Sequence, residues 1–209
     1  MERERITISI KKDVLKNVDK TIDGTNIRNR SHAIESLIIK SLDSINLNNV
    51  VIMLGGQEAL KYVNNTSEIL LALQKFGIEK VYIAVGFLSE KIKQKIGNDE
   101  DYGIKIEYIE GEGSGGVLNK LKNKFKKDTF IVIEPEYTFD KPIEDLYQIH
   151  RNSKSTVTIF TNNLDDMNGL YFIEPTIFGQ IPSGFSMLKD DIFPKLAQKG
   201  ELLVSPDLQ

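Results

Sequence analysis

The first stretch with a clear hydrophobic pattern is residues 5–10, where isoleucine and polar residues alternate strictly. This period of two predicts a β-strand with one apolar and one polar face. The apolar face carries Ile6, Ile8 and Ile10, and the polar face carries Arg5, Thr7 and Ser9.

Two short amphipathic helices are predicted to follow this strand. Residues 11–23 place apolar side chains at helical spacing, and Gly24 then suits a left-handed C-terminal cap. Ser31 is predicted as the N-cap of a second helix that continues to Leu42 with a buried apolar stripe. Arg28 and Arg30 lie just before the start of this helix.

One strand and two helices cannot enclose a core alone. A lone strand leaves both hydrogen-bonding edges unpaired, and so short a segment buries too little surface. Pairing residues 5–10 with the same strand of a second copy gives a two-stranded antiparallel ribbon with four helices on its apolar face. Residues 1–43 are therefore predicted to form a homodimerisation domain.

From residue 50 onward, short β-branched runs alternate with amphipathic segments, a pattern typical of βαβ units. Strands are predicted at 50–54, 80–85, 104–109, 129–133, 156–160 and 170–173. Helices are predicted at 67–76, 89–96, 117–125, 143–151 and 191–199. The pattern predicts a doubly wound, mainly parallel α/β domain over 50–209, after a polar linker at 44–49.

Composition and charge narrow the class of protein. The chain has 209 residues, no cysteine, only His32 and His150 as histidines, and a net charge of −3. Residues 1–43 carry 9 Lys and Arg against 7 Asp and Glu, and the rest 18 against 23, so the balance is +2 against −5. This asymmetry favours a localised cationic footprint. No apolar run could cross a bilayer and no signal peptide is visible, so a cytoplasmic protein without membrane association is expected.

Glycines and carboxylates follow several predicted strands. Ligands of parallel α/β sheets bind outside the carboxyl ends of the strands. Gly55 and Gly56 follow the first strand, Gly86 follows the second, and Glu134 and Glu136, separated by a proline, follow the fourth. Backbone amides at such glycines can approach a phosphate closely. The run 111–116 either wraps a base or sugar or is a flexible loop.

The N-terminal pattern resembles the ribbon-helix-helix family of repressors, the family of Arc and MetJ. The resemblance covers about a fifth of the chain and implies a dimeric, sequence-specific regulator of transcription that binds double-stranded DNA. It assigns base contacts to Arg5, Thr7 and Ser9. Phosphate contacts fall to Ser31 and the amides of His32 and Ala33, with Arg28 and Arg30 beside them. The alternative is that the polar face is only the solvated side of an edge strand.

Residues 50–204 resemble the sugar-phosphate nucleotidyltransferases, the enzymes that make nucleotide sugars. The sequence 51–56 (VIMLGG) is similar to the family's opening strand and glycine loop. Similarity continues through 76–87, 101–108, 169–173 and 193–196, and the glycine turn at 113–118 (GSGGVL) occupies the place of the base-binding turn. The resemblance implies a nucleotide or nucleotide-sugar ligand contacting Gly55, Gly56, Gly86, Gly115, Gly116 and Glu136.

The chain departs from this family where the family handles the triphosphate. The family's loop continues with a glycine, a threonine, an arginine and then a lysine, whereas this chain has 57–61 (QEALK). Glu58 repels a triphosphate, and the loss of the arginine removes a major catalytic contribution. Glu136 stands near the place of one metal-binding aspartate and could hold Mg²⁺. By this resemblance, the position of the family's second metal-binding aspartate lies past residue 209.

Three hypotheses follow. In the first, a dimeric DNA-binding regulator carries a degenerate nucleotidyltransferase domain that senses a nucleotide or nucleotide sugar and requires no cofactor. In the second, the α/β domain is an active sugar-phosphate nucleotidyltransferase tethered to a dimerising module. In the third, it serves only assembly, and the sequence leaves open whether dimers associate further. The first is preferred because the catalytic cations are missing.

Overall fold

The structure, a computed structural model, describes residues 4–42 and 49–206. The chain divides into two compact units, Met1–Ile45 and Asn46–Gln209. Most of the predicted linker at 44–49 lies outside the described residues. No helix in the described parts of the chain is long and apolar enough to cross a bilayer.

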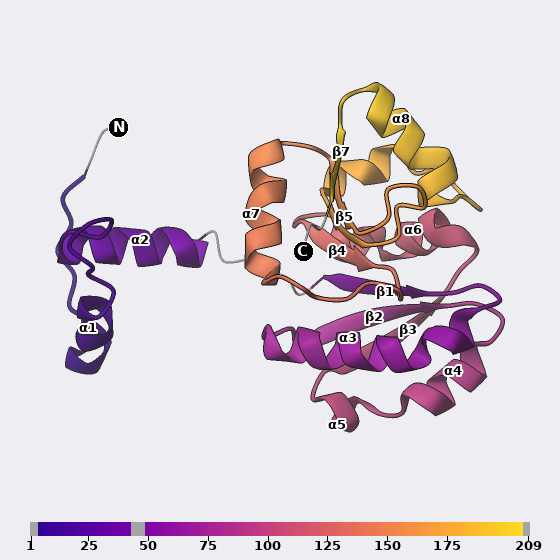
Figure 1. Cartoon of the computed structure of the whole chain (residues 1–209), viewed down its shortest axis with the longest axis horizontal. Coiled ribbons are helices and arrows are strands. Elements are labelled where there is room, and N and C mark those ends of the chain that lie inside the picture. Colours follow the sequence, from indigo (N-terminus) through magenta and orange to yellow (C-terminus); the bar gives the residue numbers. More distant parts are fainter. Residues whose placement is uncertain (1–3, 43–48, 207–209) are drawn as a thin grey trace. The chain divides into compact units, whose positions relative to one another are not determined.

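The first unit contains helices α1 (Lys12–Asp19) and α2 (Arg30–Leu42), shown in indigo and violet in Figure 1. They pack on one another around Val18 and Ala33, which are both buried. Residues 5–10, predicted as a strand, pair with no other segment in the described part of the chain. Because the expected partner strand belongs to a second copy, this pairing stays a prediction.

Both helices of this unit differ from their predicted limits. The first helix ends at Asp19, four residues before the predicted end, and the Thr21 hydroxyl donates to the Val18 carbonyl at 2.7 Å. Gly24 has a positive φ of 76°, but it belongs to a loop organised by the carboxylate of Asp23 instead of capping the helix. The second helix begins one residue before Ser31. Its N-terminal amides are capped by Asn29, whose side chain accepts from the His32 amide at 3.0 Å.

The second unit is built on a seven-stranded sheet of order β3-β2-β1-β4-β6-β5-β7. The strands are β1 (Val50–Leu54), β2 (Lys80–Val85), β3 (Lys105–Glu110), β4 (Phe130–Ile133), β5 (Val157–Thr161), β6 (Leu170–Ile173) and β7 (Leu202–Pro206). Only β6 runs antiparallel to its neighbours β4 and β5 among the described pairs. The predicted mainly parallel α/β class is therefore confirmed.

Helices cover both faces of this sheet. Figure 1 shows α3 (Val63–Lys75), α4 (Ser89–Ile96) and α5 (Asp99–Tyr102) on one side and α6 (Gly113–Phe125) and α8 (Phe193–Gln198) on the other. The helix α7 (Ile143–Ser153) packs Tyr147 and His150 on Phe172 of β6. Three short turns, η1 (Ala59–Tyr62), η2 (Pro175–Gly179) and the π-type η3 (Leu188–Ile192), complete the unit.

The core on the α6 side is rich in aromatic rings. Phe125 of α6 contacts Tyr82 of β2 and Phe130 of β4, with ring centroids 5.3 and 5.1 Å apart. Tyr171 of β6 meets Phe193 of α8 edge-on at 5.4 Å. All these side chains are buried, so this face fixes α6 and α8 against the sheet.

Several predicted limits in the α/β unit were wrong. The helix predicted at 67–76 begins at Val63, because Thr66 and Ser67 satisfy their hydroxyls on carbonyls one turn back instead of capping. The helix predicted from residue 117 begins at Gly113, within the glycine run. The segment 191–199 divides into η3 and α8. The hydrophobic pattern of the sequence predicted neither α5 nor β7.

Candidate functional site

A cavity of about 390 Å³ opens at the carboxyl ends of the parallel strands. The loops after β1, β2 and β3 and the first residue after β4 meet there because these strands are parallel neighbours. The lining residues come from the ends of β1 and β2, the loops that follow the strands, the start of α6 and the segment 185–189. They are Met53, Gly55, Gly56, Ala84, Val85, Gly86, Gly111, Gly113, Ser114, Val117, Glu134, Phe185, Met187 and Lys189.

The glycines after β1 and β2 form one wall. Gly56 has φ +85°, a conformation that L side chains rarely adopt. A Cβ added to Gly86 would lie 3.7 Å from the Gly56 amide nitrogen, so the two loops approach at backbone level. The structure thus brings Gly55, Gly56 and Gly86 together at the cavity, where the sequence predicts ligand contacts.

The glycine run at 111–116 divides in the structure: Gly111, Gly113 and Ser114 line the cavity, whereas Gly115 and Gly116 pack against other parts of the protein. Gly115 is buried and donates its amide to the Ser186 carbonyl at 2.9 Å, so this amide is engaged within the protein. A Cβ at Gly116 would lie 3.2 Å from the Gly184 carbonyl oxygen. Gly115 and Gly116 are absent from the cavity lining, and their lack of side chains lets the segment 183–187 pack on α6.

Two charged side chains face the cavity, Glu134 at the end of β4 and Lys189 in η3. The Lys189 Nζ lies 3.6 Å from the Glu134 Oε1 and also donates to the Asn168 side-chain oxygen. The Tyr171 hydroxyl is 3.0 Å from the same Glu134 oxygen. Burial raises the pKa of Glu134, although the charge of Lys189 opposes the shift. Burial raises the pKa of Tyr171 strongly.

Glu136, predicted as a ligand and Mg²⁺ contact, is exposed. It does not line the cavity, and its charge is the main reason that the pKa of Tyr62 is raised. No group of three or more acidic or histidine side chains suited to a metal was found within the described residues. Mg²⁺ is usually held by one or two carboxylates together with substrate phosphates and water, and Glu134 is the carboxylate that the described residues place in the cavity lining.

The loop after β1 offers little positive charge. It passes from Gly56 through residues 57–58 directly into η1. Glu58 is exposed and lies 3.9 Å from Lys61, the first cation after β1. Lys61 does not line the cavity. A triphosphate bound along this loop would therefore meet a carboxylate before a free cation.

An aromatic side chain stands at the mouth of the cavity. Phe185 is 66% exposed although it lines the cavity, and it follows Gly184, which has φ +91°. Phe87, next to the lining residue Gly86, is 75% exposed. An exposed ring beside a cavity provides a face on which a nucleobase can stack.

Sequence reasoning missed Phe185 and Lys189 as cavity residues. The strand-end rule placed both Glu134 and Glu136 at this edge of the sheet, but the resemblance assigned the ligand contact to Glu136, whereas Glu134 lines the cavity. Phe185 and Lys189 follow no parallel strand. Their positions depend on how the segment 183–192 folds over α6, which no local pattern in the sequence indicates.

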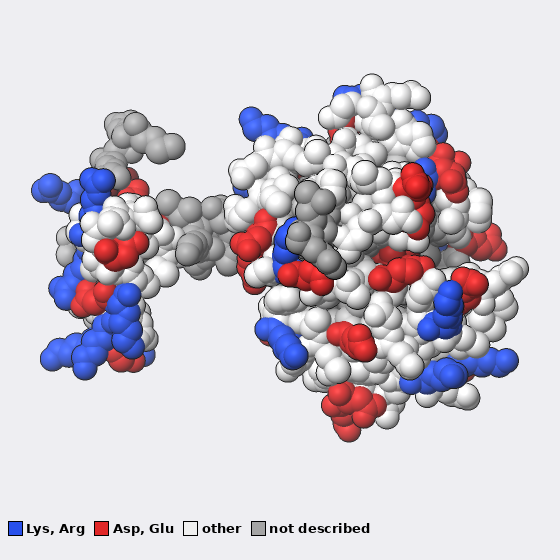
Figure 2. All heavy atoms as spheres, viewed as in Figure 1, with Lys and Arg blue, Asp and Glu red and all other residues white. Residues whose placement is uncertain are grey.

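The predicted DNA-binding residues of the first unit are exposed. Arg5, Thr7 and Ser9 all face solvent. Figure 2 shows Lys and Arg side chains gathered around α1 and the start of α2. Residues 28–32 line a shallow hollow of about 420 Å³ together with Glu35.

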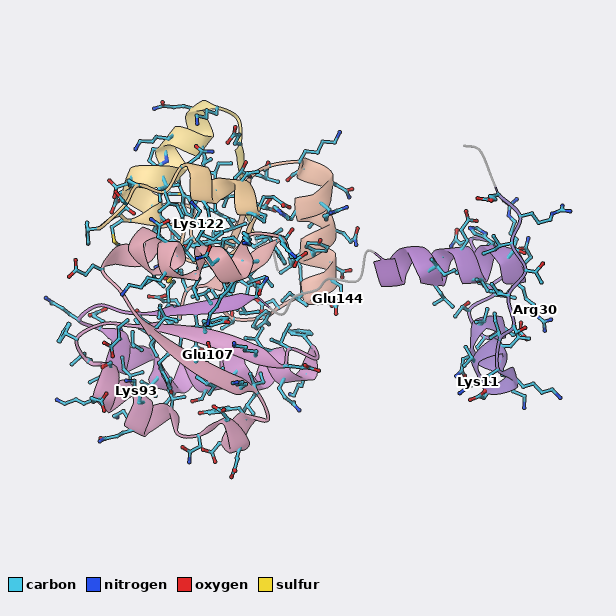
Figure 3. All side chains as sticks on the ribbon, turned by 180° about the vertical axis from the view of Figure 1, so that it is seen from behind. Lys11, Arg30, Lys93, Glu107, Lys122 and Glu144 are labelled. Atoms are coloured by element: carbon cyan, nitrogen blue, oxygen red, sulfur yellow. The ribbon has the colours of Figure 1, made fainter. Side chains whose placement is uncertain are left out.

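Three groups at this hollow already have partners within the chain. Arg30, labelled in Figure 3, forms a two-point ion pair with Asp19 at 2.7 and 2.8 Å. The His32 amide is bonded to the Asn29 side chain. Arg28 donates to the Thr25 carbonyl at 3.2 Å, and Ser31 is exposed at the start of α2.

The chain is similar in sequence to sugar-phosphate nucleotidyltransferases. No family model matches the chain. A UTP–glucose-1-phosphate uridylyltransferase of Synechocystis is 25% identical over 181 residues, covering 63% of this chain and 47% of that protein. A mannose-1-phosphate guanylyltransferase of Mycobacterium tuberculosis is 23% identical over 120 residues, covering 56% of this chain and 31% of that protein. The chain thus spans half or less of these relatives.

Solved structures show the same fold. The crystal structure of HddC from Yersinia pseudotuberculosis has a TM-score of 0.60 at 16% identity, covering 76% of this chain and 89% of that one. The inositol-1-phosphate CTP transferase from T. maritima has a TM-score of 0.52 at 11% identity, covering 77% and 85%. The second unit has a nucleotidyltransferase-like α/β fold.

Proposed function

We propose that the second unit binds a nucleotide or nucleotide sugar in the cavity at the carboxyl edge of its sheet. The observation that carries this proposal is the convergence of Gly55, Gly56 and Gly86 with the exposed ring of Phe185 around one cavity. Glycine backbone can approach a phosphate or sugar closely, and the ring offers a stacking surface for a base. The similarity to uridylyltransferase and guanylyltransferase sequences supports this ligand class.

The geometry favours binding without rapid turnover. Nucleotidyl transfer needs cations that neutralise the phosphates in the transition state. Of the described residues that line the cavity, Lys189 is the only cation, and Glu134 lies beside it. The loop after β1 supplies Glu58 near Lys61 instead of a free arginine.

Binding is tested by thermal unfolding of the full chain with UDP-glucose and with GDP-mannose. A ligand that binds only the folded state raises the Tm in a concentration-dependent way. At a ligand concentration a hundred times the Kd, it raises the free energy of unfolding by about 2.7 kcal/mol. We expect such an increase with at least one of the two. Unchanged Tm at millimolar concentrations of both would contradict the proposal.

A second candidate function is sugar-phosphate nucleotidyl transfer, which the names of the sequence relatives favour. Incubating the chain with magnesium, UTP or GTP, and glucose 1-phosphate or mannose 1-phosphate distinguishes the two. The binding proposal predicts no sustained release of pyrophosphate. Multiple turnovers per chain would establish the enzyme instead.

For the first unit, we propose pairing with a second copy and binding to double-stranded DNA. Ile6 and Ile8 are 70% and 51% exposed in the single chain, next to the exposed polar side chains of Arg5, Thr7 and Ser9. A second copy would cover the isoleucines and present the polar face outward. The whole protein would then be a regulator whose DNA binding responds to the ligand of the second unit.

DNA binding is tested by selecting a sequence from a random duplex pool with the full chain. Arg5→Ala should cost about 1 to 3 kcal/mol on the selected site and relax the preference at one base pair in each half-site. Ser31→Ala, at the predicted phosphate contact, should weaken binding to all sequences alike. Equal, sequence-independent losses in both variants would show that the strand does not read bases.

A further inference from the structure

The side chains of Glu134 and Tyr171 beside Lys189 can form two complete hydrogen-bond arrangements. The Tyr171 hydroxyl lies within hydrogen-bond distance of both the Glu134 carboxylate, at 3.0 Å, and the Met167 carbonyl, at 2.9 Å. A single hydroxyl proton can be donated to only one of them. With Glu134 ionised, Tyr171 donates to it. With Glu134 protonated, its own O–H donates to the Tyr171 oxygen, and Tyr171 donates to the Met167 carbonyl.

Lys189 keeps a partner in both arrangements. Its ammonium group donates to the Asn168 side chain as well as lying 3.6 Å from Glu134. Asn168 therefore holds Lys189 at the cavity whether or not Glu134 is charged. The charge of the pair is zero in one arrangement and +1 in the other, without any movement of the lysine.

The rest of the lining makes this charge decisive. The remaining lining residues in the described chain are glycine, serine, methionine, alanine, valine and phenylalanine. In such an apolar cavity a charge acts over a lower effective dielectric constant than in water. A ligand phosphate placed there interacts strongly with Lys189 and is repelled by an ionised Glu134.

We propose that Lys189 and Glu134 together select the ligand by charge, Lys189 by contacting a phosphate oxygen and Glu134 by repelling a bound ligand more strongly the more negative charge it carries. This inference rests on the proposed nucleotide-binding function and assigns its specificity. The ligand class it favours is a nucleotide sugar, whose diphosphate is a diester with limited charge, over a free nucleoside triphosphate.

The pair also makes ligand binding depend on pH. Glu134 is faced by Lys189 from η3, by Tyr171 from β6 and by Glu136 from its own loop, and Asp166 acts on Tyr171. Because burial raises the pKa of Glu134, this carboxyl takes up a proton at a higher pH than an ordinary glutamate. Affinity for a phosphate ligand is then expected to rise as the pH falls through that pKa. UDP-glucose is a suitable probe because its diphosphate diester keeps one charge state across this range.

The test is calorimetry of the full chain with uridine, UMP, UTP and UDP-glucose, and in parallel with guanosine, GMP, GTP and GDP-mannose. In Lys189→Met we expect about tenfold or greater loss of affinity for the nucleotide sugars, with nucleoside affinity changed less than about twofold. In Glu134→Gln we expect a gain of about threefold to tenfold for phosphate ligands, largest for the triphosphates. The same variant should lose the pH dependence of UDP-glucose binding.

Lys195→Met is the matched control, because Lys195 is an exposed lysine of α8 that does not line the cavity, and it should leave every affinity unchanged. A loss of phosphate affinity in Glu134→Gln would assign Glu134 a purely structural role and overturn the inference. Equal losses for nucleoside and nucleotide sugar in Lys189→Met would overturn it as well. If the wild-type chain binds the ligands, and Lys189→Met and Glu134→Gln both bind them with the wild-type affinities, only this inference fails. If the wild-type chain binds none of them, the proposed function and the inference fall together.

Discussion

At the scale of single residues, glycine at position 115 allows the segment 183–187 to pack directly on α6. The nearest atom to a Cβ added there is the Ser186 hydroxyl oxygen, followed by the Ser186 carbonyl oxygen at 3.1 Å and Ile192 Cδ1 at 3.2 Å. The Ser186 hydroxyl is itself buried with no hydrogen-bond partner in the described structure. The close approach therefore depends on the missing side chain.

We expect Gly115→Ala to destabilise the second unit by about 1 to 3 kcal/mol, because an added methyl group overpacks this contact. Ser186→Ala should restore part of the loss, since it removes the nearest clashing atom together with an unsatisfied hydroxyl. Urea unfolding of the single and double variants measures both effects. A double variant no more stable than Gly115→Ala alone would show that the clash lies elsewhere.

At the scale of elements, one carboxylate ties the edge strand β3 to β2 and α6. Glu107, labelled in Figure 3, lies 2.7 Å from the Lys80 Nζ and 2.9 Å from the Lys124 Nζ. Both ammonium groups also lie over the Tyr82 ring, at 4.6 and 4.8 Å from its centroid. Hydrogen bonds from the two lysines lower the pKa of Glu107 to about 2.

We expect Glu107→Gln to reduce the free energy of unfolding at pH 7 by up to about 1 kcal/mol, the range of partly exposed ion pairs. The folded-state pKa lies below the ordinary value of 4.5. The contribution is therefore complete above pH 4.5 and is lost as the pH falls towards 2. Urea unfolding from pH 7 to pH 3 should show the two proteins converging, whereas a constant difference would contradict the ion-pair account. Glu110→Gln, at a more exposed pair with Lys93, is the control.

The elements also show which features the sequence reveals. The limits of β1, β2, β6 and α4 were predicted to the residue, because each is a short apolar or amphipathic run with clear ends. Start points were missed where polar residues continue a helix, as at Thr66 and Ser67, or where glycines begin one, as at Gly113. The position of the cavity was predicted from the rule that ligands bind outside the carboxyl ends of parallel strands. The cavity residues Phe185 and Lys189 were not predicted, because only tertiary packing brings them to this edge of the sheet.

At the scale of the whole molecule, the exposed isoleucines of residues 5–10 predict a dimer. Ile8→Lys should leave the chain monomeric, because burying an unpaired charge in the pairing face costs several kcal/mol. Thr7→Lys places the same charge on the opposite face and should remain dimeric. Sedimentation equilibrium measures both variants, and a dimeric Ile8→Lys protein would mean that the copies do not pair through this strand.

If the two units act together, ligand and DNA must influence each other equally. A ligand that changes DNA affinity by some factor is itself bound more or less tightly by that factor when DNA is present, because coupling free energies are reciprocal. We expect the affinity for UDP-glucose or GDP-mannose to shift when the selected duplex is added. Identical ligand affinities with and without DNA would limit the second unit to binding without regulation.

The central claim is that the cavity at the carboxyl edge of the sheet binds a nucleotide sugar. The most direct measurement is calorimetric titration of UDP-glucose and GDP-mannose into the wild-type chain, Gly86→Phe and Gly179→Phe. Gly86 lines the cavity, whereas Gly179 is an exposed glycine of η2 with open space at its Cβ position and lies outside the lining. The account predicts binding of at least one ligand to the wild type and to Gly179→Phe, with binding abolished in Gly86→Phe. Undiminished binding to Gly86→Phe, or no binding to the wild type, would contradict it.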